Sequence, residues 1–471
     1  MQPVTLNTLM KWLDPAGHPD VRLLGKPAPD MLIDEMIIDS RKTGSTSLFC
    51  AFAGERTDGH DYIGKAFEAG TPLVLASDEA KVQKIEIPEG RAIILVENVT
   101  AAIGRIARGL RESFPGPVIG ITGSVGKTST KDLTAAVLSG HFHPLKTQGN
   151  LNNEIGLPMT LTRLCKESFD AAVVEMGLDR AGDIDYLASL AEPEIGIVTN
   201  IGPSHIENFG SQEGILHAKL ELVPYLRGLK KLFLNGDDPL LYSMRDQLPV
   251  KPEYFGKDAR NDCRLLETGR TEEGRLYVRA SYHGAVYEVS IDTLGLHMAM
   301  NVLPGIMTGV TLGMTAEEIR EGLRAYEATP HRLQPVLTSR FLIIDDTYNA
   351  SPTSMMSALD TLMELPSRGR RVAVLGDIKE MGTFSREGHR QVGTHAAGLK
   401  PDLLLTCGEE GRHIYEAALE QGMSRDQCLY FPDLSALKEG ILPLLETGDT
   451  VLLKASHSME FTSLVPLLTE E

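Results

Sequence analysis

Cysteine is scarce in this sequence, and the cysteines that are present form no recognisable pattern. The 471 residues include five cysteines, which are scattered, odd in number and never spaced as C-x-x-C. A disulfide framework or a zinc site needs pairs or clusters of cysteines at characteristic spacings. The sequence therefore predicts neither, and reduced thiols of a cytoplasmic protein are expected.

Long apolar runs are missing as well. No segment of the sequence reaches the ~20 consecutive apolar residues that a membrane-spanning helix needs. The first residues also lack the basic flank and apolar core of a secretory signal. We therefore predict no membrane span.

Positive charge is in short supply. The chain has 46 Lys and Arg against 64 Asp and Glu, which gives a formal net charge of -18. A surface with this charge repels the phosphates of nucleic acids, so nucleic-acid binding is not predicted. A local basic pocket for a small anionic ligand is still compatible with the composition.

What the chain does have is a glycine-rich turn between an apolar run and a helix-forming run, over residues 120–131. Gly123 and Gly126 let the backbone turn and bring N–H groups against phosphate oxygens. Lys127 can reach the outer phosphates, and the Thr128 hydroxyl can ligate Mg²⁺. One glycine of the strict Walker spacing is displaced by a single residue. A purely structural turn and a dinucleotide fingerprint are the weaker alternatives, since neither needs the Gly-Lys-Thr core.

The length exceeds what one core usually holds, and the pattern divides the chain into three α/β segments. Residues 1–113 alternate short apolar runs with helical patterns, and a Pro-Gly-Pro linker follows at 115–117. Residues 114–332 repeat the order strand then helix, which predicts a parallel sheet of the P-loop ATPase type with an antiparallel patch over 263–292. Residues 333–471 predict a Rossmann-like, doubly wound sheet.

Polar side chains follow two of the apolar runs in the central segment. Glu175 comes directly after one run, and His205 closes a polar stretch after another. Because ligands of open α/β sheets collect beyond the carboxyl ends of the strands, both side chains are predicted to face the phosphates. Together with Thr128 they could hold Mg²⁺. Taken singly, Glu175 could be an ion-paired carboxylate and His205 a turn histidine.

Two further groups of residues have ordinary structural explanations, and a third group favours a functional loop. Lys219 lies in a helical stretch, and from the residues alone it is predicted to be a solvated surface lysine. His297 and Asn301 share one helix face, as a core histidine and a capping amide would. Asp345 and Asp346 follow an apolar strand and precede turn formers, which favours a loop that faces a shared cleft.

These motifs resemble, in their order and rough spacing, those of the Mur ligase family. They are Thr122–Thr128, Glu175–Gly177, Thr199–His205, Ala218-Lys219, His297–Asn301 and Asp346. Within the family, the segments Gly149–Gly156, Asp345–Met355 and Leu375–Gly382 are similar to those of the member that joins D-alanyl-D-alanine to UDP-N-acetylmuramoyl-tripeptide. The chain departs from the expected pattern at Ser351, in place of asparagine, and at Ile378-Lys379, in place of Met-Leu.

The resemblance implies an ATP-dependent ligase of bacterial peptidoglycan precursor synthesis that works through an acyl phosphate. It implies an N-terminal domain for the UDP-sugar, a central ATP-binding domain and a C-terminal Rossmann-like domain. ATP and Mg²⁺ are the implied cofactors, and UDP-N-acetylmuramoyl-tripeptide and D-alanyl-D-alanine are the implied substrates. We expect a cytoplasmic monomer.

The resemblance also implies roles for individual residues. The catalytic residues it implies are Lys127, Glu175, His205 and Lys219. The metal ligands are Thr128, Glu175, His205 and Lys219, the last as a carbamate formed with CO₂. The nucleotide contacts are Gly123, Ser124, Val125, Gly126, Lys127, Thr128, Ser129, Asn301, Arg332 and Asp346. The substrate contacts are Ser40, Arg41, Asn150, Asn153, Tyr348 and Asn349. A surface turn explains Ser40 and Arg41 equally well.

Several alternatives stay open at this point. The tripeptide-forming Mur ligase is less favoured, because it usually has an Asp-Tyr-Ala-His type of loop where this chain has Asp346-Thr-Tyr-Asn-Ala. A folate-polyglutamating relative is less favoured still. Outside the family, a P-loop kinase or a nucleotide-controlled binding protein would share the phosphate loop. ATP turnover that requires both a peptide carboxylate and an amine would identify a ligase.

Overall fold

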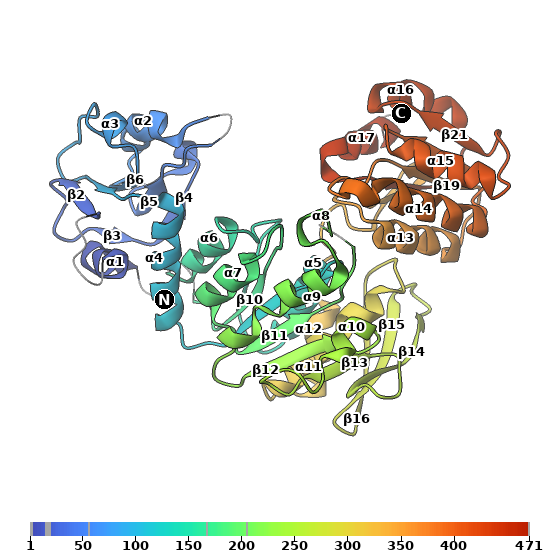
Figure 1. Ribbon diagram of the computed structural model, residues 1–471, viewed down its shortest axis with the longest axis horizontal. Helices are drawn as coiled ribbons and strands as arrows, with labels where there is room; N and C mark the ends of the chain where they lie inside the picture. The colour runs from blue at the N-terminus through green and yellow to red at the C-terminus, as the bar shows by residue number, and fades with distance from the viewer. Residues whose placement is uncertain (1–2, 15–19, 55–56, 166–167, 204–205, 470–471) are drawn as a thin grey trace.

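The computed structural model describes residues 3–14, 20–54, 57–165, 168–203 and 206–469, and all strand orders and element bounds below refer to these residues. Figure 1 shows three lobes along the chain: an N-terminal lobe in blue, a central lobe in green and yellow, and a C-terminal lobe in orange and red. In the described residues no helix is long and apolar enough to cross a membrane.

The N-terminal lobe is built on a sheet with the strand order β2-β7-β6-β5-β4, in which β2 is the antiparallel edge strand. Apolar side chains of α1 and α4 cover one face and those of α2 and α3 the other, while β1 and β3 form a separate antiparallel pair. The elements are β1 Val4–Thr5, α1 Leu6–Leu13, β2 Arg22–Gly25, β3 Leu32–Ile33, β4 Glu35–Ile37, β5 Ser47–Cys50, α2 Ile63–Glu68, β6 Leu73–Ala76, α3 Glu79–Val82, β7 Ala92–Leu95 and α4 Val99–Ser113.

The central lobe holds the sheet β16-β15-β14-β13-β12-β11-β8-β10-β9. Its strands run parallel from β9 to β14, and β14, β15 and β16 are antiparallel, so the predicted parallel sheet and antiparallel patch are both confirmed. The elements are β8 Val118–Thr122, α5 Lys127–Leu138, β9 Pro144–Lys146, α6 Gly156–Thr162, β10 Ala171–Glu175, α7 Asp183–Ala191, β11 Ile195–Val198, α8 Ile206–Phe209, α9 Gln212–Leu220, β12 Lys231–Asn235, α10 Pro239–Ser243, β13 Glu253–Gly256, β14 Cys263–Arg270, β15 Leu276–Tyr282, β16 Ala285–Ile291, α11 Met298–Thr311 and α12 Ala316–Arg324.

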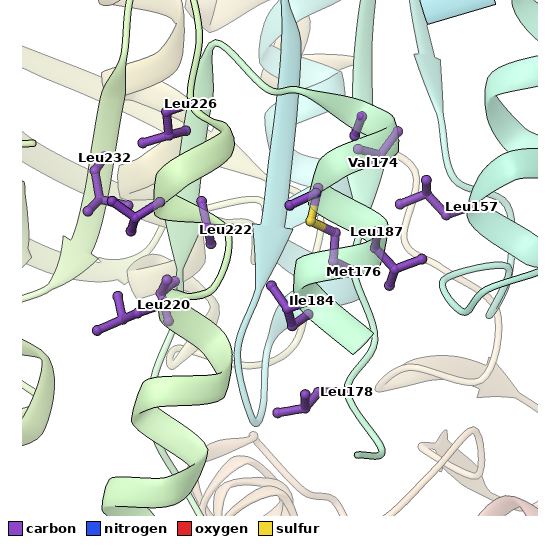
Figure 2. Close-up of a cluster of buried hydrophobic side chains, with 14 of the residues drawn as sticks. Leu157, Val174, Met176, Leu178, Ile184, Leu187, Leu220, Leu222, Leu226 and Leu232 are labelled. Carbon is purple, nitrogen blue, oxygen red and sulfur yellow. The ribbon is translucent and has the colours of Figure 1, made fainter. Parts of the chain in front are cut away.

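Helices cover both faces of the central sheet, which explains why its inner strands are apolar without interruption. One face carries α6, α7 and α9, and the other carries α5, α11 and α12. Figure 2 shows part of the first core, in which side chains such as Met176, Ile184 and Leu187 gather against the sheet. Burial on both sides fixes the strand ends, and with them the loops that carry polar residues.

The C-terminal lobe has the sheet β17-β18-β22-β19-β20-β21, parallel except for the edge strand β17. Helices α13 to α15 pack on one face, and α16 and α17 on the other, so the predicted doubly wound sheet is confirmed. The elements are β17 Gln334–Leu337, β18 Leu342–Asp345, α13 Pro352–Glu364, β19 Arg371–Leu375, α14 Ser385–Leu399, β20 Leu403–Cys407, α15 Gly411–Glu420, β21 Cys428–Phe431, α16 Leu434–Gly440, β22 Thr450–Lys454 and α17 Leu464–Thr469.

Ser351, one of the departures from the family pattern, is the N-cap of α13. Its hydroxyl accepts a hydrogen bond from the backbone N–H of Ser354, and Pro352 is the first residue of the helix. Serine and asparagine are comparably good N-caps, so the exchange preserves the start of this helix.

Arg111 joins the N-terminal and central lobes from a fully buried position at the end of α4. Its guanidinium donates to the Ala191 carbonyl at 2.6 Å, to the Glu192 carbonyl at 3.0 Å and to both oxygens of the Glu194 carboxylate at 2.8 Å. These partners lie at the end of α7 and just after it, and α7 packs beside α4. The sequence pattern did not identify this anchor.

We predict that Arg111→Ala lowers the free energy of unfolding by about 2–4 kcal/mol, because it empties a fully buried position and takes a donor from the Ala191 and Glu192 carbonyls, while the Glu194 carboxylate keeps the Arg227 side chain and the Val118 N–H. Denaturant unfolding followed by circular dichroism measures the loss. Arg108→Ala on the same helix is the matched control, since its half-exposed side chain makes only surface ion pairs, worth at most about 1 kcal/mol. Equal losses in the two variants would contradict the anchor.

Candidate active site

The phosphate loop between β8 and α5 has the backbone that its glycines predict. Gly126 is the N-cap of α5 in the left-handed region, at φ +83°. A Cβ on Gly123 would lie only 1.9 Å from the Thr199 hydroxyl oxygen, so a side chain does not fit there. The N-terminus of α5 therefore opens directly into the loop, where its free N–H groups and dipole favour an anion.

Residues after β11 hold this loop in shape. The Asn200 side chain accepts from the Val125 N–H at 2.9 Å and donates to the Val125 carbonyl at 2.9 Å. Thr199 donates to the same carbonyl at 2.6 Å, and the Ser124 N–H donates to the Asn200 carbonyl at 3.1 Å. These contacts give Thr199 and Asn200 a direct role in shaping the loop. Sequence reasoning included them in a motif but assigned them no function.

The side chains of Lys127 and Asn301 lie at the phosphate loop. Lys127 Nζ donates to the Gly123 carbonyl at 2.8 Å, and burial lowers its pKa although the Glu175 carboxylate opposes this effect. The Asn301 amide oxygen lies 3.0 Å from the place where a Cβ on Gly126 would be. Both residues are thus positioned next to the predicted phosphate site.

A cavity of about 550 Å³ lies between the central and C-terminal lobes. Its size is that of a site for a nucleotide or a substrate of similar bulk. The structure brings most of the predicted contacts together here. Those that line it are Ser124, Val125, Gly126, Lys127, Thr128, Asn150, Asn153, Glu175, Arg332, Tyr348 and Asn349. Gly123, Ser129, Lys219, Asn301, Asp346, Ser40 and Arg41 are not among the lining residues.

Glu175 and Thr128 present oxygen atoms to this cavity. Glu175 is almost fully buried at the end of β10, and its Oε1 accepts from the Asn152 side chain at 2.8 Å. Among the described residues, its buried Oε2 has no hydrogen-bond partner. The Thr128 hydroxyl accepts from Arg332 Nη2 at 3.2 Å. An unpartnered carboxylate oxygen and a hydroxyl on residues that line the same cavity are a fitting donor set for Mg²⁺.

The other two predicted metal ligands differ in how far the structure describes them. Lys219 is 2% exposed on α9, so the expectation of a solvated lysine is wrong. The chain folds α9 against the sheet, and periodicity alone could not reveal this. Burial, and after it the charge of Lys127, lower the pKa of Lys219 well below its usual value. His205 lies outside the described residues. Within the described part of the chain, no three His, Cys, Asp or Glu side chains form a metal cluster.

Arg332 reaches into the cavity from the segment that joins the central and C-terminal lobes. Its guanidinium lies 4.3 Å from the centre of the Tyr348 ring, a cation–π distance. Its Nε is buried and lacks a hydrogen-bond partner among the residues that the structure describes. Arg332 thus keeps donor capacity for an anion next to Thr128.

Asp346 has its carboxylate bound by protein groups. The Leu333 N–H donates to Oδ1 at 3.2 Å, and the buried Lys454 donates to Oδ2 at 2.6 Å and to the Asn349 carbonyl at 2.9 Å. Asp346 therefore orders the loop that follows β18, and its nucleotide contact stays a prediction. Lys454 lies at the end of β22, and sequence reasoning missed it.

Ser40 and Arg41 lie in a short 3₁₀ turn, Ser40–Lys42, of the N-terminal lobe. The Asp39 carboxylate accepts from Arg41 Nε and Nη2 at 2.9 Å each. The hydrogen bond from the Arg41 side chain lowers the pKa of Asp39 to about 2. The charge of Arg41 is thus paired in this surface turn, and a contact with the UDP-sugar stays a prediction.

His389 supports the wall that the C-terminal lobe contributes to the cavity. Its Nε2 accepts from the Ile378 N–H at 2.9 Å, and its Nδ1 lies 2.7 Å from the Ser385 carbonyl. The neighbouring Lys379 N–H donates to the Ser456 hydroxyl at 2.9 Å. Ile378, Lys379 and Ser456 all line the cavity. The ring must be neutral to accept at Nε2.

Burial lowers the pKa of His389, although Ser385, Asp377 and Glu410 oppose this effect. The unfolded chain therefore binds a proton at His389 more readily than the folded chain does. The contribution of the neutral ring to the free energy of unfolding is complete above the ordinary histidine pKa, and it is lost as pH falls toward the lower pKa of the folded state. We predict that His389→Gln flattens the pH dependence of unfolding between about pH 7 and pH 5, where one such group contributes at most about 1.4 kcal/mol per pH unit. His395→Gln on the same helix is the control. An unchanged slope in His389→Gln would contradict the assignment.

Comparison with known proteins gives consistent matches along the chain. The models described as "Mur ligase family, catalytic domain", "Mur ligase middle domain" and "Mur ligase, glutamate ligase domain" match residues 32–111, 121–309 and 331–457. The "UDP-N-acetylmuramoyl-tripeptide--D-alanyl-D-alanine ligase" of Bacillus subtilis (strain 168) is 35% identical over 440 residues, which are 93% of this chain and 94% of that relative.

Two solved structures have the same fold and similar sequences. "Crystal structure I of MurF from Acinetobacter baumannii" has a TM-score of 0.85 and 27% identity, and covers 100% of both chains. The MurF ligase from Thermotoga maritima in complex with ADP has a TM-score of 0.79 and 27% identity, over 94% of this chain and 98% of that one.

Proposed function

The chain belongs to the Mur ligase family, and from this membership we infer its reaction. It is an ATP-dependent, ADP-forming ligase that joins D-alanyl-D-alanine to UDP-N-acetylmuramoyl-tripeptide in peptidoglycan precursor synthesis. The observation that carries this assignment is the 35% identity to the Bacillus subtilis ligase over 93% of the chain. The phosphate loop and the cavity beside it supply the machinery that such a reaction needs.

The chemistry begins with activation of a carboxylate. An amine cannot displace an oxygen of a free carboxylate, so the terminal carboxylate of the tripeptide attacks the γ-phosphorus of ATP and ADP leaves. The amine of the dipeptide then attacks the carbonyl carbon of the acyl phosphate, loses a proton, and phosphate leaves. Three anionic groups meet in the first step, and we propose that Lys127, the loop N–H groups and Arg332 stabilise their charge.

Thr128 and Glu175 would hold Mg²⁺, and the proposal rests on the free Glu175 oxygen and the Thr128 hydroxyl of residues that line one cavity. The bound ion supplies positive charge at the phosphates. Lys219 adds an anionic ligand if its neutral amine takes up CO₂ and releases a proton, which leaves a carbamate. Burial supports this step, because only the unprotonated amine is nucleophilic. His205 completes the proposed set by family resemblance.

The remaining residue roles are proposals of the same kind. Asn150, Asn153, Tyr348 and Asn349 would contact the substrates, and their support is their place in the cavity wall. Gly123, Ser129, Asn301 and Asp346 would contact or shape the nucleotide site. Ser40 and Arg41 would contact the UDP-sugar.

We further propose that the functional domains are 1–113, 114–332 and 333–471. The enzyme would act as a monomer in the cytoplasm, where nucleotide-linked substrates are found. Size-exclusion chromatography with light scattering tests the oligomeric state directly.

Phosphate release from ATP tests the function. Release should require both UDP-N-acetylmuramoyl-tripeptide and D-alanyl-D-alanine, and the pentapeptide product should form in equal amount. A tripeptide-forming ligase would instead use the dipeptide precursor with lysine or diaminopimelate, and a kinase would give a stable phosphorylated product without any amine. Activity with single D-amino acids but not with D-alanyl-D-alanine would refute the assigned acceptor.

A further inference from the structure

A short turn at residues 329–333 leads from the central lobe into the C-terminal lobe, and it carries Arg332. The Arg332 N–H donates to the Thr329 carbonyl at 3.2 Å, which closes the turn. His331 and Leu333 adopt left-handed backbone angles, at φ +61° and +47°. Such angles are unfavourable for residues other than glycine and persist only where neighbouring contacts fix them. The turn is therefore held by its surroundings.

On its C-terminal side the turn is fixed by the loop after β18. The Tyr348 N–H donates to the His331 carbonyl at 3.1 Å, and the His331 ring lies 2.7 Å from the Asp345 carboxylate. The Leu333 N–H donates to Asp346. These contacts attach residues 331–333 to the C-terminal lobe. The start of the turn, at Thr329, is attached separately to the central lobe.

Asp132 provides that second attachment. It lies on α5, the helix that begins at the phosphate loop, and it is 4% exposed. Its Oδ1 faces Lys146 at 2.8 Å and Lys131 at 3.3 Å, while its Oδ2 accepts a hydrogen bond from the Thr329 hydroxyl. The two lysines outweigh the effect of burial and lower the pKa of Asp132, so the carboxylate that binds Thr329 is charged. A hydrogen bond to a charged acceptor is among the stronger ones.

We propose that Asp132 is a positioning residue which, through the Thr329 hydroxyl, fixes the turn so that Arg332 points at the nucleotide phosphates. Helix α5, which begins at the phosphate loop, thereby also fixes the start of the turn at Thr329. Arg332 then reaches Thr128, the second residue of that same helix, and stacks on Tyr348 from the C-terminal lobe. The inference rests on the proposed function in one respect, that the phosphates of ATP bind at this loop.

Thr329→Val is the sharpest test, because it removes only the hydroxyl and leaves Asp132 with its two lysines. We expect KM for ATP to rise about tenfold, the usual effect of losing one hydrogen bond to a charged group. KM for UDP-tripeptide should change less than twofold, and Thr329→Ser should restore KM for ATP. Thr361→Val is the matched control, since it removes a buried hydroxyl that donates to the Ser357 carbonyl within α13. Melting temperatures of the variants show whether the fold is retained.

A double-mutant cycle with Arg332→Ala separates positioning from a merely structural role. If Thr329 acts through Arg332, adding Thr329→Val to Arg332→Ala should cause no further rise in KM for ATP. Effects that multiply, or a Thr329→Val variant that behaves like Thr361→Val, would overturn the proposal. An Arg332→Ala variant with unchanged KM for ATP would instead refute the assignment of Arg332 to the nucleotide site, and with it the premise of the proposal.

Discussion

Replacement of Lys219 by alanine is expected to lower the ligation rate by about 10³-fold or more, while ADP binding persists. The expectation follows from the position of Lys219, which is 2% exposed and whose pKa is lowered by burial and by Lys127. If the amine becomes a carbamate, the variant loses an anionic group beside the transferring phosphate, a place where single contacts have large effects on rate. Steady-state ligation and calorimetric ADP titration measure the two quantities.

A short carboxylate distinguishes loss of the carbamate from loss of structure. Acetate should restore part of the activity of Lys219→Ala by occupying the vacated space, and it should have no effect on the unmodified enzyme. Lys251→Ala, at an exposed position of the central lobe, is the control and should retain full activity. A Lys219→Ala variant that keeps most of its activity would contradict any role for this residue in the reaction.

Replacement of Lys127 by alanine is expected to lower kcat by at least about 10²-fold, because it removes a positive charge directed at the phosphoryl group in transfer. Its Nζ donates to the Gly123 and Ser124 carbonyls, at 2.8 and 3.3 Å, and so lies at the phosphate loop itself. The melting temperature should change little, because the Lys127 side chain is only partly buried and is not part of the apolar core. Initial rates at saturating substrates measure the effect, and near-normal ligation would contradict the assignment of the loop to catalysis.

The fold was predictable to the extent that it follows from local pattern. Apolar runs such as Ile195–Val198 are strands because both faces of the sheet are covered, and the Gly-Lys-Thr core marks the start of α5. The sheet then places Glu175 at the cavity that Thr128 also lines, whereas His205, the other residue of the strand-end prediction, lies outside the described residues.

The contacts that pattern could not predict join residues far apart in the chain. Asp132 and Thr329 are separated by 197 positions, and Arg111 and Glu194 by 83. Each side chain alone looks like an ordinary surface charge or turn residue, and only the tertiary arrangement makes them partners. Lys219 shows the same limit, since the charge suggests exposure and the packing of α9 buries it.

We infer above all that the tripeptide carboxylate is activated by direct attack on the γ-phosphate of ATP at the cavity between the lobes. Tripeptide substrate labelled with ¹⁸O in its terminal carboxylate tests this claim most directly, with the released phosphate and the pentapeptide analysed by mass spectrometry. An acyl phosphate requires that one labelled oxygen leaves with the phosphate and that the other stays in the new amide. Phosphate without label, released while the pentapeptide forms, would contradict the account.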